Sequence, residues 1–224
     1  MRRMLPTLSL LLVIPGVLAC SGRQENGYPA SGPTAGEGAA SAPAGPRVVF
    51  LGDSLTAGYG LAEDQAFPAL LGVLLQQEGR GIEVVNAGVS GDTTAGGLAR
   101  IDWILDQEPD VVVVGLGGND ALRGLPLDGT EENLREIVTR CRDSGARVLL
   151  LGMRMLPNYG PDYVRRFESI YPRLAKELDV PLVPFLLDKV GGVRRLNQDD
   201  GIHPTAEGQR LVARNVLPYL RKLV

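Results

Sequence analysis

The chain alternates between short apolar runs and longer stretches with a helical pattern. The apolar runs are rich in leucine or β-branched residues, and in Val111–Val114 both faces of a strand would be apolar. Strands buried on both faces are typical of a parallel sheet that is covered by helices on each side. The sequence therefore predicts a three-layer α/β/α sandwich with about five parallel strands. The expected strands are Val48–Leu51, Ile82–Val85, Val111–Leu116, Val148–Leu151 and Leu182–Phe185.

Three helices are predicted where apolar residues recur at intervals of three and four. Two of these patterns contain a proline, Pro172 and Pro218, which predicts a kink or an end, because proline has no N–H for the helical ladder. The three apolar faces are Phe67, Leu70, Leu71 and Leu74; Phe167, Tyr171, Leu174 and Leu178; and Leu211, Val212, Val216 and Leu220.

A polar or glycine-rich segment follows each expected strand. Ligands of parallel α/β sheets bind beyond the carboxyl ends of the strands, so these segments should gather at one edge of the sheet. In chain order they contain Ser54, Gly88, Gly117–Asp120, Met153–Gly160 and Asp200–His203.

The chain has a single histidine, His203, and therefore only one candidate imidazole base. A serine hydroxyl needs an adjacent base to become a nucleophile, and the base needs a carboxylate to orient it. Ser54 stands in Gly-Asp-Ser-Leu after the first expected strand, and Asp200 stands three residues before His203. These residues form a candidate catalytic triad. Asp199 stays open as an alternative to Asp200, because spacing alone does not decide between adjacent aspartates.

Each candidate also has an ordinary structural explanation. Asp53 or Ser54 could cap a helix, and a lone histidine is more often a solvated surface residue. Pro204 argues for a fixed histidine, because the residue before a proline is held extended and so His203 should lie on a loop.

Acyl transfer also requires donors that bind an oxyanion. Gly88 offers a backbone N–H and Asn119 offers a side-chain amide. A glycine turn and an asparagine in a tight loop are the ordinary alternatives.

Taken together, these segments resemble the four sequence blocks of the SGNH (GDSL) hydrolases, in order and with similar intervals. The resemblance covers Arg47–Val224. Within the family, the sequence most resembles small bacterial arylesterases and periplasmic thioesterase/lysophospholipase enzymes. The blocks are Gly52-Asp53-Ser54-Leu55, Gly88, Gly117-Gly118-Asn119-Asp120 and Asp200-Gly201-Ile202-His203.

The resemblance implies a serine esterase with a flavodoxin-like strand order, 2-1-3-4-5, and no cofactor. It implies that Ser54 is the nucleophile, His203 the base and Asp200 the residue that orients the base. It also implies an oxyanion hole formed by the Ser54 N–H, the Gly88 N–H and the Asn119 side chain.

The segment Met153–Tyr163 is a candidate wall for an acyl pocket, through Met155, Leu156 and Tyr159. An ordinary strand-to-helix connection explains it equally well. With one tryptophan and 5% aromatic residues, the chain offers no sugar-stacking platform. The expected substrates are therefore small-molecule or lipid acyl esters, namely short- to medium-chain esters, aryl esters, thioesters or lysophospholipids. The alternatives are a carbohydrate O-deacetylase and a catalytically silent envelope-binding lipoprotein.

The first 46 residues differ in composition from the rest. Residues 1–20 read as a signal peptide, with Arg2 and Arg3 before an apolar stretch that is too short to span a bilayer comfortably. Val17-Leu18-Ala19-Cys20 resembles a lipobox, in which Cys20 would be lipidated. Residues 21–46 contain 19 Gly, Ala, Pro or Ser among 26 and predict a flexible tether that reaches about 30 Å. We expect export from a bacterial cytoplasm to the cell envelope or periplasm, with residues 47–224 as a lipid-anchored hydrolase domain.

Charge and residue counts exclude other classes of function. A net charge of −3 without a basic stripe argues against nucleic acid as a partner. One histidine and no cysteine cluster give no zinc signature, and no group of carboxylates has the spacing of a metal site, so no metal is expected. Cys141 would have no partner if Cys20 is lipidated, and we interpret it as a packed free thiol.

Overall fold

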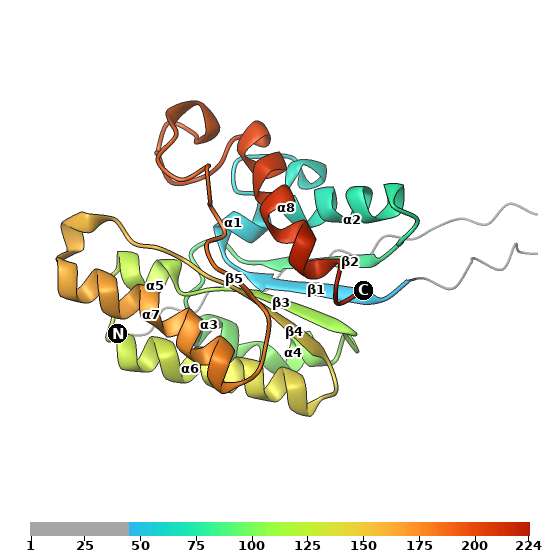
Figure 1. Cartoon of the computed structure of the whole chain (residues 1–224), viewed down its shortest axis with the longest axis horizontal. Coiled ribbons are helices and arrows are strands. Elements are labelled where there is room, and N and C mark those ends of the chain that lie inside the picture. Colours follow the sequence, from blue (N-terminus) through green and yellow to red (C-terminus); the bar gives the residue numbers. More distant parts are fainter. Residues whose placement is uncertain (1–44) are drawn as a thin grey trace, which may run out of the picture. The chain divides into compact units, whose positions relative to one another are not determined.

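The computed structural model describes residues 45–224 and confirms the predicted sandwich (Figure 1). Five parallel strands form one sheet in the order β2-β1-β3-β4-β5, which is the order that the resemblance implied. The strands are β1 (Arg47–Gly52), β2 (Glu83–Gly88), β3 (Val111–Gly115), β4 (Arg147–Leu151) and β5 (Leu182–Val183).

Helices cover both faces of the sheet (Figure 1). One face carries α2 (Phe67–Gln77) and α8 (Ala206–Leu220), and the other carries α3 (Thr94–Ala99), α4 (Ile101–Leu105), α6 (Leu127–Asp143) and α7 (Pro161–Glu177). Two short helices, α1 (Ser54–Ala57) and α5 (Gly118–Leu122), begin just past β1 and β3, and 3₁₀ turns span Glu63–Gln65, Pro157–Tyr159 and Arg194–Leu196.

The side chains of each central strand alternate between two hydrophobic cores. On β1, Val49 and Leu51 pack in the core beneath α4, α6 and α7, whereas Val48 and Phe50 pack in the core beneath α2 and α8. All four side chains are fully buried. Burial of such side chains stabilises a fold by about 1.5–3 kcal/mol each. The two-faced apolar pattern of the sequence is thus explained by helices on both sides.

The fifth strand is shorter than predicted. Residues Leu182–Phe185 were expected to be extended, but β5 contains only Leu182 and Val183. Pro184 has no N–H to donate to the ladder, so the pairing with β4 ends there.

Both prolines lie inside their helices. Pro172 lies inside α7, and α8 continues through Pro218 to Leu220. Helix α8 ends two residues after Pro218, close to the predicted position. The apolar faces are confirmed in their main residues, since Phe67, Leu71 and Tyr171 are buried.

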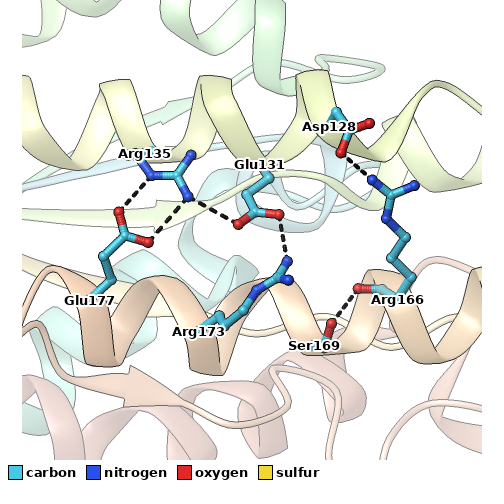
Figure 2. A network of polar contacts seen from close by, with 7 residues as sticks. All are labelled: Asp128, Glu131, Arg135, Arg166, Ser169, Arg173 and Glu177. Atoms are coloured by element: carbon cyan, nitrogen blue, oxygen red, sulfur yellow. Dashed lines mark hydrogen bonds and ion pairs between the residues drawn. The ribbon is translucent and has the colours of Figure 1, made fainter.

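Helices α6 and α7 are joined by a network of charged side chains (Figure 2). Arg135 donates to Glu177 at 2.7 Å and to Glu131 at 3.0 Å, and Arg173 donates to the second oxygen of Glu131 at 2.5 Å. Most of these side chains are partly exposed, so each ion pair contributes little to stability.

Cys141 lies on the inner face of α6 and is fully buried. Burial raises the pKa of its thiol to about 12, so the thiol stays protonated at neutral pH. The prediction of a packed thiol is confirmed.

Within residues 45–224, no helix combines the length and the apolar character needed to cross a bilayer. The predicted signal peptide, the lipidation site at Cys20 and nearly all of the predicted tether lie outside the described residues.

Candidate active site

Ser54 is the first residue of α1, directly after β1. Asp53 is the residue that caps this helix, because its Oδ1 accepts the backbone N–H of Leu55 at 3.0 Å. The Ser54 hydroxyl is therefore not needed as a cap. It lies 2.8 Å from His203 Nε2.

His203 lies on a loop that also carries its carboxylate partner. Its Nδ1 is 2.6 Å from Asp200 Oδ2, and the other carboxylate oxygen accepts the backbone N–H groups of Ile202 at 2.9 Å and His203 at 3.0 Å. These bonds, first of all the one from the His203 N–H, lower the pKa of Asp200 to about 2. Asp200 is thus ionised at neutral pH, and it is Asp200 rather than Asp199 that contacts the imidazole.

The loop that carries His203 spans residues 197–204 and is called the histidine loop. It has the form of a narrow hairpin. Asn197 and Pro204 pair as an isolated antiparallel bridge, and the Gln198 N–H donates to the His203 carbonyl at 2.7 Å. Gly201 at the tip has φ +71°, a conformation that glycine adopts without strain. The loop presents the His203 side chain at the carboxyl edge of the sheet.

Gly88 ends β2 where α1 comes very close. A Cβ at this position would lie 2.3 Å from the backbone nitrogen of Ala57, so only glycine fits. Its N–H donates to Asn86 Oδ1 at 3.1 Å, while Asn86 Nδ2 donates to the carbonyl of Thr56 at 3.0 Å. The predicted oxyanion donor is therefore at the right edge of the sheet, but it already has a local acceptor.

Asn119 lies in the first turn of α5, beyond the end of β3. Its Nδ2 donates to the Asp92 carbonyl at 2.9 Å and lies 3.4 Å from Asp53 Oδ2. The second contact is long for a hydrogen bond, so one amide hydrogen is only weakly engaged.

The sequence did not predict that the Asp53 side chain lies in the site, next to Asn119. Its carboxyl is buried between α1 and Asn119, and burial raises its pKa to about 6, partly offset by the Leu55 N–H. The only signal in the sequence was an acid beside the candidate nucleophile, and helix capping explained that acid equally well.

A second buried acid, Asp120, supports the neighbouring loop. Its carboxylate accepts the Thr94 N–H at 2.9 Å and the Thr94 hydroxyl at 2.5 Å, and it is 2% exposed. It links α5 to α3 and so fixes the turn that carries Asn119.

The three candidate acyl-pocket residues have different environments. Met155 packs partly buried against the core beneath α6 and α7, and Tyr159 donates its hydroxyl to the Leu122 carbonyl at 3.1 Å. Leu156 is 61% exposed.

A hollow of about 770 Å³ lies beside the histidine loop. It is lined by Gly192, Arg194, Arg195, Asn197, Gln198, Asp199 and Gly201. None of the three candidate pocket residues lines it, so their contact with substrate stays a prediction.

A hydroxyl, an imidazole and a carboxylate in hydrogen-bonded series, at the carboxyl edge of a parallel sheet, define the class of α/β serine hydrolases. Both ring nitrogens of the one histidine are used in this series, as the chemistry requires.

Comparison with known proteins places the chain within this class. Residues 50–211 match the model of the GDSL-like Lipase/Acylhydrolase family. The chain is 45% identical over 178 residues to Esterase TesA of Pseudomonas aeruginosa, covering 79% of this chain and 89% of that protein. It is 44% identical over 184 residues to thioesterase 1/protease 1/lysophospholipase L1 of Escherichia coli K12, covering 82% and 87%. The crystal structure of TesA superposes with a TM-score of 0.77 over 80% of this chain and 99% of that one. The chain therefore belongs to the GDSL-like lipase/acylhydrolase family, and it is an ester hydrolase of the SGNH type.

Proposed function

We propose that the protein hydrolyses esters and thioesters of apolar acyl groups through an acyl-enzyme intermediate on Ser54. The observation that carries this proposal is the continuous series Ser54–His203–Asp200, with contacts of 2.8 and 2.6 Å. Membership of an acylhydrolase family supports the same reaction.

The contacts assign a role to each side chain. The Asp200 carboxylate favours a proton on Nδ1 of His203, which leaves the Nε2 lone pair facing the Ser54 hydroxyl. His203 takes the serine proton as Oγ attacks the acyl carbon, and it then passes this proton to the departing alcohol or thiol. A water molecule, activated by the same imidazole, then releases the acid from Ser54.

Three donors are proposed to bind the oxyanion. The Ser54 N–H is at the first position of α1, where a helix offers no internal acceptor. Asn119 has one amide hydrogen that only Asp53 contacts, at 3.4 Å, and an oxyanion would compete for it effectively. The Gly88 N–H would be shared with Asn86 Oδ1.

Leu156, which is exposed on the connection that follows β4, supports an apolar acyl group as the proposed substrate. Purified protein should be assayed with p-nitrophenyl esters of increasing acyl length, a lysophospholipid, an acyl thioester and an acetylated glycan. Each methylene buried against Leu156 should add about 0.8 kcal/mol to transition-state binding, so kcat/KM should climb and then flatten.

Leu156→Asp should flatten that climb, with Val73→Asp as the control, because Val73 is similarly exposed but lies on α2. A preference for acetyl over all longer acyl groups, together with rapid deacetylation of the glycan, would instead favour a carbohydrate esterase. Absence of turnover on every substrate would favour a silent binding protein.

The proposed location is the bacterial cell envelope, with lipid attachment at Cys20 and residues 21–46 as the tether. The lipobox-like sequence before Cys20 supports this proposal. The full chain should partition into the detergent phase and with membranes, and Cys20→Ser should release it or leave it unprocessed. Partitioning that Cys20→Ser does not change, with the signal removed, would refute the lipid anchor.

A further inference from the structure

Gln198 joins the histidine loop to residues 54–60, which contain Ser54, α1 and Tyr59 and are called the serine segment. Its side-chain Nε2 donates across to the Tyr59 carbonyl at 2.7 Å and back to the Pro204 carbonyl at 3.1 Å. Its backbone N–H donates to the His203 carbonyl at 2.7 Å. One amide hydrogen of this half-buried side chain therefore crosses to the serine segment, and the other closes the histidine loop on itself.

The backbone beside Tyr59 is shaped for this contact. Gly60 has φ +77°, and a Cβ at this position would lie 2.5 Å from Gln198 Oε1. The ring of Tyr59 lies against the imidazole of His203, with 4.6 Å between centroids and a tilt of 39°. The residue that receives the Gln198 amide thus also contacts the histidine.

A second glutamine, which follows His203 in the chain, joins α8 to the residues around α1. Gln209, in the first turn of α8, donates to the Leu55 carbonyl at 3.1 Å and accepts the Phe67 N–H at 3.0 Å. It is 1% exposed. Gln198 and Gln209 thus precede and follow His203 in the chain, and both reach the chain around Ser54.

The sheet alone does not hold the histidine loop in place. β5 is only two residues long, and the segment from Pro184 to Thr205 contains one 3₁₀ turn and one isolated bridge. Asp200 lies on the same loop as His203 and is bonded to it, so this contact does not tie His203 to the serine. Contacts that cross from the loop to the serine segment are therefore needed to set the distance between Ser54 and His203.

We propose that Gln198 is a positioning residue that holds the histidine loop in register with the serine helix through its hydrogen bond to the Tyr59 carbonyl. This inference rests on the proposed catalytic function of Ser54 and His203. Gln198 touches neither the serine hydroxyl nor the imidazole through its side-chain amide, so it acts through the placement of the loop. Loss of the bond would lengthen or tilt the contact between His203 Nε2 and Ser54 Oγ.

The test compares the full-length wild type with Gln198→Met, which keeps the length of the side chain but has no N–H donor, and with Gln198→Glu. Active sites are counted by titration with a fluorophosphonate, so that unfolded protein does not lower the apparent rate. We expect kcat per active site to fall roughly 10- to 100-fold, because small misplacements of a catalytic group are costly. KM should change by less than about threefold, and the rate of fluorophosphonate labelling should fall with kcat.

Gly60→Ala provides an independent perturbation, because the added methyl group pushes on Gln198 Oε1 while leaving Gln198 in place. It should lower kcat in the same way. Asp188→Asn is the matched control, since Asp188 is an exposed acid on the same connection between β5 and α8, and its kcat should stay at the wild-type value.

Values of kcat for folded Gln198→Met and Gly60→Ala within about a factor of two of wild type would overturn the proposal. A loss confined to KM would overturn it as well, because it would indicate a substrate-binding role. Ser54→Ala, assayed in parallel, separates the two inferences. If Ser54→Ala is inactive while the Gln198 variants are normal, only the positioning role fails.

Discussion

His203 Nε2 lies 2.8 Å from Ser54 Oγ, although 149 residues separate the two along the chain. Ser54 follows β1, and His203 lies in the loop between β5 and α8. Parallel strands end at one edge of a sheet, so residues distant in sequence meet there. The contact is therefore a product of the sheet topology, whereas the contact between His203 and Asp200 is local to one loop.

Asp200 should matter far more than its neighbour Asp199. Asp200→Asn removes the carboxylate that holds Nδ1–H and should lower kcat by about 10⁴, as in other triads of this kind. Asp199→Asn should be mild. Steady-state kinetics on both variants, with folding checked by circular dichroism, test this expectation. Reversed effects would assign the orienting role to Asp199.

Asn119→Ala should lower kcat by roughly 10²–10³ with little change in KM, because an oxyanion contact strengthens only as charge develops. Asn133→Ala is a suitable control. Asn133, on α6, donates to the Thr94 hydroxyl at 3.1 Å, so Asn133→Ala removes an amide that is bonded to Thr94. An Asn119 variant with raised KM and normal kcat would show a ground-state binding role instead.

Asp53 should make stability depend on pH. Burial raises its pKa from 3.8 to about 6, so the folded state holds a proton that the unfolded state releases. Its contribution to stability is therefore complete below pH 3.8 and is lost as the pH rises through about 6. Asp53→Asn keeps an oxygen for the Leu55 N–H and cannot ionise.

The unfolding free energy of Asp53→Asn relative to wild type should rise by up to about 3 kcal/mol between pH 4 and pH 7. Urea denaturation of both proteins across this range measures the difference. Asp199→Asn serves as an exposed-acid control and should give a flat difference. A flat difference for Asp53→Asn as well would show that this carboxyl is solvated in the folded protein.

The strands were predictable because both faces of each central strand are buried, as in Val111–Val114. The end of β5 could not be predicted from the sequence. It is set by Pro184, which interrupts the pairing with β4, and the sequence does not show which strand lies beside it. The short helices α3 and α5 have no apolar periodicity, and their ends are set by tertiary contacts such as Asp120 with Thr94. Periodicity alone could not find them.

The site was predictable where its geometry is local. Asp200 and His203 share one loop, so their spacing indicated a contact, but the choice between Asp199 and Asp200 needed the folded structure. The contact of Asn119 with the Asp92 carbonyl and the bridge from Gln198 to Tyr59 join segments that approach only in the folded chain. Single residues of such types carry no signal in a sequence.

The central claim is that Ser54 is the nucleophile and that His203 activates it. The most direct measurement is the mass of the intact protein after reaction with a fluorophosphonate, followed by peptide mapping. We expect one adduct, on Ser54, in wild type. We expect none in Ser54→Ala, and strongly slowed labelling in His203→Ala. An adduct on another residue, or wild-type turnover by pure Ser54→Ala, would contradict the account.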